Sequence, residues 1–298
     1  MKDREWRILV TGAGGLLGSK IVDKAAKKFS VYPTHATRPL FPNSLKMNIT
    51  DEDEVRRVFG KVKPDIVIHT AAETNVDKCE NNKNYALNAN AEGTKILAKA
   101  CKEVDARIVY VSTDYVFDGE KGLYVEEDEP NPVNYYGLTK LMGEKYVADL
   151  CESFVIVRTS VLYGVHPEKP NFAKWVIATL TEGKPLTVVE DHYNSPTLAE
   201  NLADVILEII DKKLEGVYHT AGSERISRYE FALEIAETFN FDAGLIQPIK
   251  MSKLKAWVAK RPKDSSLCVD KVRKEIDMEL LGVAQGLKEM KRNWAKTK

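Results

Sequence analysis

The sequence predicts an α/β fold: a Rossmann-like, doubly wound parallel sheet with a smaller C-terminal substrate-binding lobe. Short β-branched runs alternate with helical patterns through the first half of the 298 residues. The first run is followed by a glycine-rich turn at residues 11–18 and then by an apolar helix. The runs are apolar almost without interruption, which is typical of parallel strands covered by helices on both faces.

The first half contains most of the expected sheet. The expected strands are residues 7–10, 31–33, 45–47, 65–69, 107–111 and 154–157. One helix follows the glycine turn to about residue 28, and another begins with the acidic turn 51–54, which suits the positive end of its dipole. Two longer helices are expected over residues 84–101 and 136–150.

After about residue 160 the alternation loosens. The expected helices are 172–182, 198–212 and 229–239, the expected strands are 186–189 and 217–219, and the polar tail 251–298 holds short helices. We therefore expect a dinucleotide-binding domain over residues 1–160. Residues 161–298 are expected to form mainly a substrate-binding lobe, from which some segments return to the sheet, either as its sixth strand alone or as its sixth and seventh strands.

Composition argues against several classes of protein. Lys+Arg and Asp+Glu both number 44, so the net charge is zero, unlike that of a strongly basic nucleic-acid binder. The four cysteines lack metal-ligand spacing, which favours reduced thiols and no metal. The charged start, residues 1–6, does not resemble a signal peptide, and no apolar run reaches the ~20 residues that cross a bilayer. We expect a cytoplasmic protein without nucleic-acid or membrane partners.

The glycine turn is a candidate phosphate site. Gly12 permits the tight turn, Gly15 lets a pyrophosphate approach the backbone, and Gly18 lets helix and sheet pack closely. Leu16 and Leu17 open the helix, whose N-terminus would meet the phosphates. The alternative is a glycine-rich turn without a ligand.

Residues 32–38 bear on the choice of dinucleotide. They contain no Asp or Glu to bind a free ribose 2′-hydroxyl, whereas Arg38, with Thr34 or His35 beside it, suits a 2′-phosphate. This favours NADPH, with NADH possible and a solvated surface charge as the alternative for Arg38. Asn48 and Ile49 are expected beside the adenine. Ala71 and Ala72 would leave room for the cofactor backbone.

Tyr136 and Lys140 lie four residues apart, about one helical turn, so they share a helix face. A free phenol has a pKa near ~10, and a nearby ammonium is expected to lower it toward neutrality. Thr113, at the end of an apolar run, would hold the substrate oxygen while Tyr136 protonates it. These three residues are the candidate catalytic set.

Several motifs occur in a familiar order. They are the glycine turn, Asn90 in the long helix, the segments 74–80 (Thr-Asn-Val-Asp-Lys-Cys-Glu) and 112–119 (Ser-Thr-Asp-Tyr-Val-Phe-Asp-Gly), Tyr136–Lys140, and segments 157–160, 171–172, 191–197 and 261–267. The chain resembles the extended short-chain dehydrogenase/reductases, and within them the dTDP-4-dehydrorhamnose reductases. The resemblance implies that Lys140 holds the nicotinamide ribose and that Asn90 belongs to the cofactor site.

The resemblance also implies a substrate site formed by Thr74, Val76, Ser112, Asp114, Arg158, Tyr193 and Arg261. Two arginines have alternatives. Arg158 ends a strand and is also suited to pairing with a carboxylate, and Arg261 suits either a diphosphate or a salt bridge. The family has a Trp after Arg-Thr-Ser, but this chain has Val161, which puts that substrate contact in doubt.

The implied reaction is the NADPH-dependent reduction of the 4-keto group of a nucleotide-activated 6-deoxysugar, from dTDP-4-dehydrorhamnose to dTDP-L-rhamnose. Related dehydratases carry Glu where this chain has Tyr115, so water elimination would lack a proton carrier. The alternatives are a nucleotide-sugar epimerase and a non-catalytic regulatory subunit resembling the β-subunit of methionine adenosyltransferase. A homodimer is compatible with the resemblance, and a magnesium ion cannot be placed.

Overall fold

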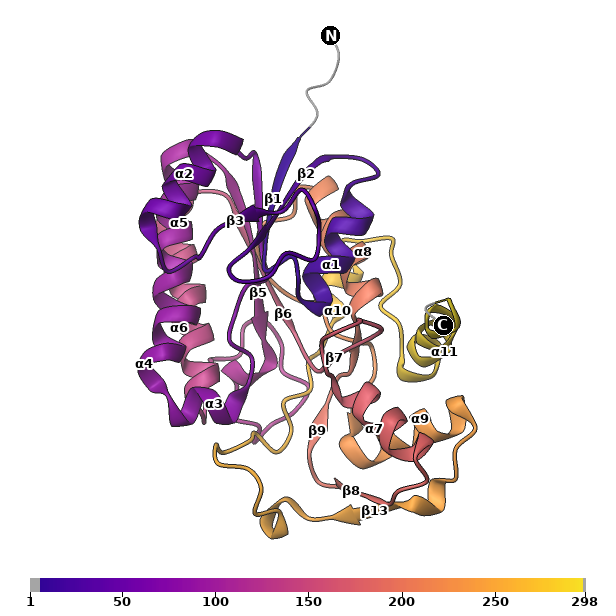
Figure 1. Cartoon of the computed structure of the whole chain (residues 1–298). Coiled ribbons are helices and arrows are strands. Elements are labelled where there is room, and N and C mark those ends of the chain that lie inside the picture. The colour runs from indigo at the N-terminus through magenta and orange to yellow at the C-terminus, as the bar shows by residue number, and fades with distance from the viewer. Residues whose placement is uncertain (1–5, 297–298) are drawn as a thin grey trace.

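A seven-stranded parallel sheet forms the centre of the computed structural model, which describes residues 6–296 (Figure 1). The order is β11-β6-β5-β4-β1-β2-β3. The strands are β1 (Arg7–Thr11), β2 (Ser30–His35), β3 (Leu45–Lys46), β4 (Ile66–His69), β5 (Arg107–Thr113), β6 (Phe154–Thr159) and β11 (Gly216–His219). The predicted parallel sheet is confirmed, and residues 161–298 return one strand to it, β11, which is its seventh. Most of the charged start, residues 1–5, lies outside the described residues.

Helices cover both faces of the sheet, as Figure 1 shows. Helices α1 (Leu16–Ala25) and α8 (Ala199–Asp211) pack on one face, with Ile8 and Val10 beneath them. Helices α2 (Glu52–Val62), α5 (Gly93–Val104) and α6 (Tyr135–Leu150) cover the other face, where Leu9 packs. Alternate residues of one strand therefore enter opposite cores, which explains the unbroken apolar runs.

The second half supplies both sheet and lobe. Its lobe is built from α7 (Phe172–Thr181), α9 (Arg228–Phe239), α11 (Val283–Ala295) and the parallel pair β8 (Leu186–Val189) and β13 (Ile246–Ile249). A third apolar core, including Phe231 and Leu287, holds these elements together. Short strands complete it: β7 (Leu162–Tyr163), β9 (Tyr193–Asn194), β10 (Thr197–Leu198) and β12 (Ile226–Ser227). A short helix, α10 (Asp270–Arg273), packs against β11.

Two helix predictions need correction. The helix expected over residues 84–101 is present but longer and irregular: α4 (Lys83–Ala86), a π-helical turn η1 (Leu87–Glu92) and α5 follow one another without a gap. The helix after the glycine turn ends at Ala25 instead of near residue 28. Sequence reasoning also missed α3 (Val76–Asn81), although Asn75 caps it by accepting a hydrogen bond from the Lys78 N–H.

Two further observations concern the thiols and the lengths of the helices. Cys79, Cys101, Cys151 and Cys268 are free thiols. Within residues 6–296, no helix combines the length and apolarity that crossing a membrane requires.

Candidate active site

The glycine turn joins β1 to α1 and is tightly packed. Gly12 has φ +66°, and a Cβ there would lie 2.7 Å from the Cα of Ala71. A Cβ on Gly18 would lie 2.4 Å from the Gly12 carbonyl oxygen, and one on Gly15 would lie 3.1 Å from that oxygen. The three glycines thus allow backbone segments to approach one another closely, as the motif predicts.

Helix α1 begins directly after this turn with an open N-terminus. Its N-cap is Gly15, and no side chain accepts a hydrogen bond from the first turn. The unpaired N–H groups and the helix dipole make this end attractive to a phosphate. The first turn contains no acidic residue that would repel an anion.

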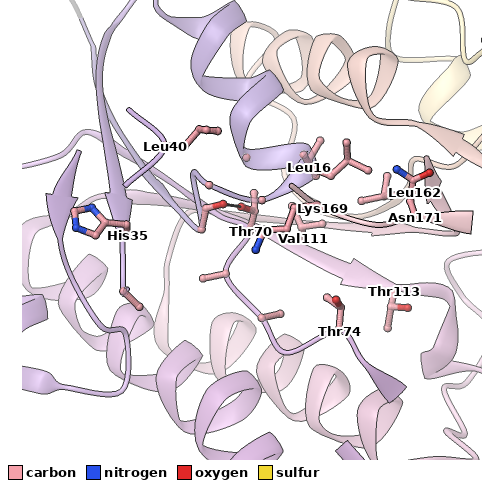
Figure 2. A pocket seen from close by; sticks show the side chains of 18 of the residues that line it. Leu16, His35, Leu40, Thr70, Thr74, Val111, Thr113, Leu162, Lys169 and Asn171 are labelled. Carbon is pink, nitrogen blue, oxygen red and sulfur yellow. Dashed lines mark hydrogen bonds between the residues drawn. The ribbon is translucent and has the colours of Figure 1, made fainter. Parts of the chain in front are cut away.

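A cavity of about 1020 Å³ opens in front of the turn. Figure 2 shows His35 and Leu40 at one end of the cavity and Thr113, Leu162 and Asn171 toward the other. Fourteen predicted site residues line it: Gly12, Gly15, Leu16, Leu17, Gly18, Arg38, Ala71, Ala72, Thr74, Ser112, Thr113, Asp114, Tyr136 and Lys140. The cavity is at the upper end of the usual range for ligand sites.

The three candidate catalytic residues come from two neighbouring elements. Thr113 ends β5, and its hydroxyl donates to Asp114 at 3.1 Å. Tyr136 and Lys140 belong to the first turns of α6, which Asn134 caps by accepting from the Gly137 N–H. The cap fixes where the helix starts and thereby aims Tyr136 and Lys140 at the cavity.

The expectation that Lys140 lowers the pKa of Tyr136 is wrong for this structure. Burial raises the pKa of Tyr136, although hydrogen bonding to Thr113 opposes the shift. The Lys140 ammonium donates to the Val111 carbonyl oxygen at 2.8 Å, and burial lowers its own pKa to about 7 despite the Glu144 carboxylate. Desolvation therefore dominates both groups, and the phenol stays protonated at neutral pH.

Asp114 lines the same cavity and is buried. The hydroxyls of Ser160 and Ser265 donate to its Oδ2 at 2.8 and 2.5 Å. Burial raises the pKa of its carboxyl against those hydrogen bonds. Tyr115 follows it, packed edge-on against Tyr136 with ring centroids 6.0 Å apart.

Three predicted cofactor residues lie outside the cavity lining. The Asn48 side chain accepts from the N–H of Thr50, and Ile49 is buried against Gly93. Asn90 is buried, where its amide bonds both the N–H and the carbonyl of Glu73. In this structure Ile49 and Asn90 are buried while Asn48 is exposed, and a direct cofactor contact of all three stays a prediction.

Four predicted substrate residues also lie outside the lining: Val76, Arg158, Tyr193 and Arg261. Arg158 forms a buried ion pair with Glu144, its Nη2 lying 2.7 Å from Oε2. Arg261 pairs with Asp77 at 2.9 Å, while the Tyr193 ring stacks under Arg225 at 3.9 Å. The salt bridges that were alternatives for the two arginines are present, and their contact with a substrate stays a prediction.

The sequence reasoning missed part of the lining. Pro39, Leu40 and Tyr85 join the predicted residues, as does the segment 168–171 between β7 and α7, while Thr34 and His35, expected beside Arg38, line the cavity too. Asn171 belongs to the recognised motif 171–172, whereas residues 168–170 carry no sequence signal besides their place just before it. Val161 lines the cavity with φ +44°, a left-handed conformation that is rare for a β-branched residue. Across residues 6–296, no three His, Cys, Asp or Glu side chains are arranged to hold a metal.

Comparisons with known proteins agree with this geometry. The family model described as RmlD substrate binding domain matches residues 6–295. A probable low-salt glycan biosynthesis reductase, Agl14, of Haloferax volcanii is 36% identical over 274 residues, covering 90% of this chain and 91% of that protein. Methionine adenosyltransferase 2 subunit beta of Bos taurus is 32% identical over 290 residues, covering 94% and 83%.

Solved structures show the same relationship. The dTDP-4-dehydrorhamnose reductase of Bacillus anthracis, in complex with NADP, superposes with a TM-score of 0.90 at 32% identity and covers 97% of this chain and 99% of that chain. A hypothetical dTDP-4-dehydrorhamnose reductase of Sulfolobus tokodaii is 40% identical, with a TM-score of 0.86 and coverage of 94% and 98%. With its glycine turn, Tyr136 and Lys140 around one cavity, the chain belongs to the RmlD substrate binding domain family and has the Rossmann-like fold of the extended short-chain dehydrogenase/reductases.

Proposed function

We propose that this chain is an NADPH-dependent reductase of the 4-keto group of a nucleotide-activated 6-deoxysugar, converting dTDP-4-dehydrorhamnose to dTDP-L-rhamnose. The observation that carries the proposal is the presence of Thr113, Tyr136 and Lys140 in one cavity with the glycine turn. The relative that superposes with a TM-score of 0.90 is a reductase of this kind in complex with NADP.

The residues around the cavity fit a dinucleotide. The open N-terminus of α1 offers backbone N–H groups to a pyrophosphate, and Gly12 and Gly18 let the turn that presents them pack tightly. Arg38, exposed at the His35 end of the cavity, would meet a 2′-phosphate, and Lys140 would hold the nicotinamide ribose. The cofactor, when bound, supplies the hydride.

The chain's own residues would manage the proton. Thr113 would hold the ketone oxygen by its hydroxyl, and Tyr136 would donate the proton that this oxygen needs as charge develops there. The raised pKa of Tyr136 keeps the phenol protonated and ready to donate in the reducing direction. Asp114, fixed by Ser160 and Ser265, would accept a hydrogen bond from a sugar hydroxyl beside Thr113.

Two alternatives are kept. A nucleotide-sugar epimerase would use the same Thr113 and Tyr136 but would retain its dinucleotide through purification. A regulatory subunit is favoured by the 32% identity to methionine adenosyltransferase 2 subunit beta. The intact set Thr113, Tyr136 and Lys140 argues for catalysis, since binding to a partner needs no proton donor in the cavity.

The test is a turnover assay with enzymatically made dTDP-4-dehydrorhamnose and either NADPH or NADH. We expect NADPH oxidation, and we expect Tyr136→Phe to lower kcat by ~10²–10⁴-fold because the proton donor is removed. Tyr135→Phe is the matched control: the neighbouring phenol lies outside the cavity lining and should keep the wild-type rate.

Three outcomes would contradict the reductase. They are a dinucleotide that stays bound through purification, copurification with a larger partner without any turnover, and a Tyr136→Phe variant near the wild-type rate. A cytoplasmic location and a homodimer are part of the proposal, and light scattering on the purified protein checks the second.

A further inference from the structure

A buried carboxylate lies just behind the cavity, one turn after Lys140 on α6. Lys140 is 3% exposed and Glu144 is 4% exposed. Their spacing is the one at which acids and lysines pair on a helix. Instead, the Lys140 ammonium donates to the Val111 carbonyl oxygen at 2.8 Å, and the described residues contain no ion pair of Lys140.

Arg158 explains why Glu144 does not pair with the lysine. Its guanidinium binds the carboxylate with a fork, Nε to Oε1 at 3.0 Å and Nη2 to Oε2 at 2.7 Å. The Ser112 hydroxyl adds a third bond, to Oε1 at 2.5 Å. Ser112 on β5 and Arg158 on β6 are direct partners in the sheet register, so both reach the carboxylate from the strand side.

The rest of the guanidinium meets a neutral group. Arg158 Nη1 lies 3.5 Å from Nε2 of His219 on β11. His219 Nδ1 donates to the Tyr124 carbonyl at 2.9 Å, which leaves Nε2 as an acceptor. Burial and the Arg158 charge lower the pKa of His219 to about 3, so the imidazole is uncharged near pH 7. The charge of Arg158 is therefore balanced by Glu144.

The other titratable groups near Lys140 are neutral as well. The ammonium lies 4.1 Å from the centre of the Tyr110 ring on β5. Burial raises the pKa of Tyr110 and of Tyr136, and it lowers the pKa of His69 on β4. Burial also raises the pKa of Cys79, on α3 near Tyr136, to about 11. Glu144 is thus the charged side chain that acts on the lysine, and Arg158 binds that carboxylate.

We propose that Arg158 is a positioning residue for Lys140: its fork holds Glu144 against the sheet, so that the lysine stays free for the cofactor. This inference rests on the proposed function, because it takes Lys140 as the group that holds the nicotinamide ribose. Without Arg158, the Glu144 carboxylate is free to pair with Lys140, one turn away. Without Glu144, the Arg158 charge faces the lysine uncompensated.

The sign of each effect follows from charge. Below the pKa of Lys140, its ammonium can donate to the ribose hydroxyls and so contributes to cofactor affinity. This contribution to affinity is lost as pH rises through that pKa. Burial lowers the pKa of Lys140 to about 7 in the free protein. A freed Glu144 carboxylate stabilises the Lys140 ammonium, so the loss of cofactor affinity moves to higher pH. An uncompensated Arg158 charge destabilises the ammonium, so the loss of affinity moves to lower pH.

The experiment measures the dissociation constant of NADPH by fluorescence titration as a function of pH. The Lys140→Met variant should lack the part of this pH dependence that comes from the lysine, and comparison with the wild type therefore identifies that part. We expect Arg158→Met to move that part up by roughly one pH unit and Glu144→Gln to move it down by a similar amount. The double variant R158M/E144Q, which removes both charges, should return it close to the wild-type position.

Two further variants complete the test. Arg56→Met removes an exposed ion pair with Glu52 on α2 and should change nothing. Ser112→Ala removes one donor to Glu144 and should give a smaller upward shift, which keeps the proposal testable if Arg158→Met does not fold. Profiles that coincide, or single variants that shift in the same direction, overturn the positioning role. A wild-type protein that binds no NADPH overturns the proposed function as well.

Discussion

At the scale of single residues, Gly12 meets two constraints that can be separated. Its φ of +66° is costly for a side chain, and a Cβ would also lie 2.7 Å from the backbone of Ala71. Gly183 has the same φ of +66°, but a Cβ there would have no neighbouring atom within 4 Å. Comparing the two positions separates the free-energy cost of the positive φ from the cost of the close contact with Ala71.

We expect Gly183→Ala to lower the free energy of unfolding by about 1–2 kcal/mol through φ alone. Gly12→Ala should cost more and should weaken NADPH binding at least ~10-fold, because the turn must move away from Ala71. Thermal melting and NADPH titration of both variants check this. Equal stability losses with unchanged affinity for Gly12→Ala would show that the close approach is not required.

Val161 shows where residue-level prediction stops. The sequence identifies it as a departure from the family pattern, but its φ of +44° at the cavity wall is a backbone property that no local pattern predicts. A strained β-branched residue persists only when its surroundings fix it. Here its carbonyl accepts from the Thr197 N–H at 3.2 Å, across a sequence distance that local propensity cannot span.

At the scale of elements, the π-helical turn η1 separates α4 from α5. Asn90 sits in this turn, and its side chain bonds Glu73 twice and Thr139 Oγ1 at 3.1 Å. These contacts tie η1 to the chain after β4 and to α6, which carries Tyr136 and Lys140. A π turn at such a place is common near functional sites.

We expect Asn90→Ala to destabilise the protein by about 1–3 kcal/mol, because the N–H of Glu73 loses its partner. Cofactor affinity should fall as well, since α6 loses its tie to Thr139. Asn88→Ala, on the same turn but exposed, should be near neutral. Chemical denaturation gives the stabilities. If Asn90→Ala weakens NADPH binding without any loss of stability, Asn90 contacts the cofactor directly, as the family resemblance implies.

The elements also show why some predictions succeeded. Strands such as β4 are apolar on both faces, so period and composition alone identify them. The predicted acidic start of α2 is confirmed, and the Asp51 side chain accepts from the Glu54 N–H at 3.0 Å. The π-helical turn η1 carries Asn90, whose side chain bonds Glu73 and Thr139, 17 and 49 residues away. Long-range bonds of this kind leave no periodic signal in the helix itself.

At the scale of the whole molecule, the cavity draws its lining from both halves of the chain. The glycine turn and Arg38 come from the first half, while Val161, Leu162 and the segment 168–171 come from the second. The candidate catalytic residues could be predicted because they fall in short motifs. The family resemblance implies a substrate contact for Arg158, although the fold seats it behind the wall against Glu144. Motif spacing identifies the chemistry of a residue, but packing decides whether its side chain lines the cavity or lies behind the lining.

Because both halves line one cavity, a dinucleotide should stabilise the whole protein. At a concentration of 100 times its dissociation constant, NADPH should add about 2.7 kcal/mol, which raises Tm by roughly 4 °C. NADH at the same concentration should raise Tm less if Arg38 binds the 2′-phosphate. Arg38→Ala should remove that difference and leave the NADH shift intact, whereas Arg56→Ala, on the surface of α2, should preserve it. Equal shifts for the two cofactors in the wild type would show that Arg38 is a solvated charge, and a Tm unchanged by either would remove the cavity as a dinucleotide site.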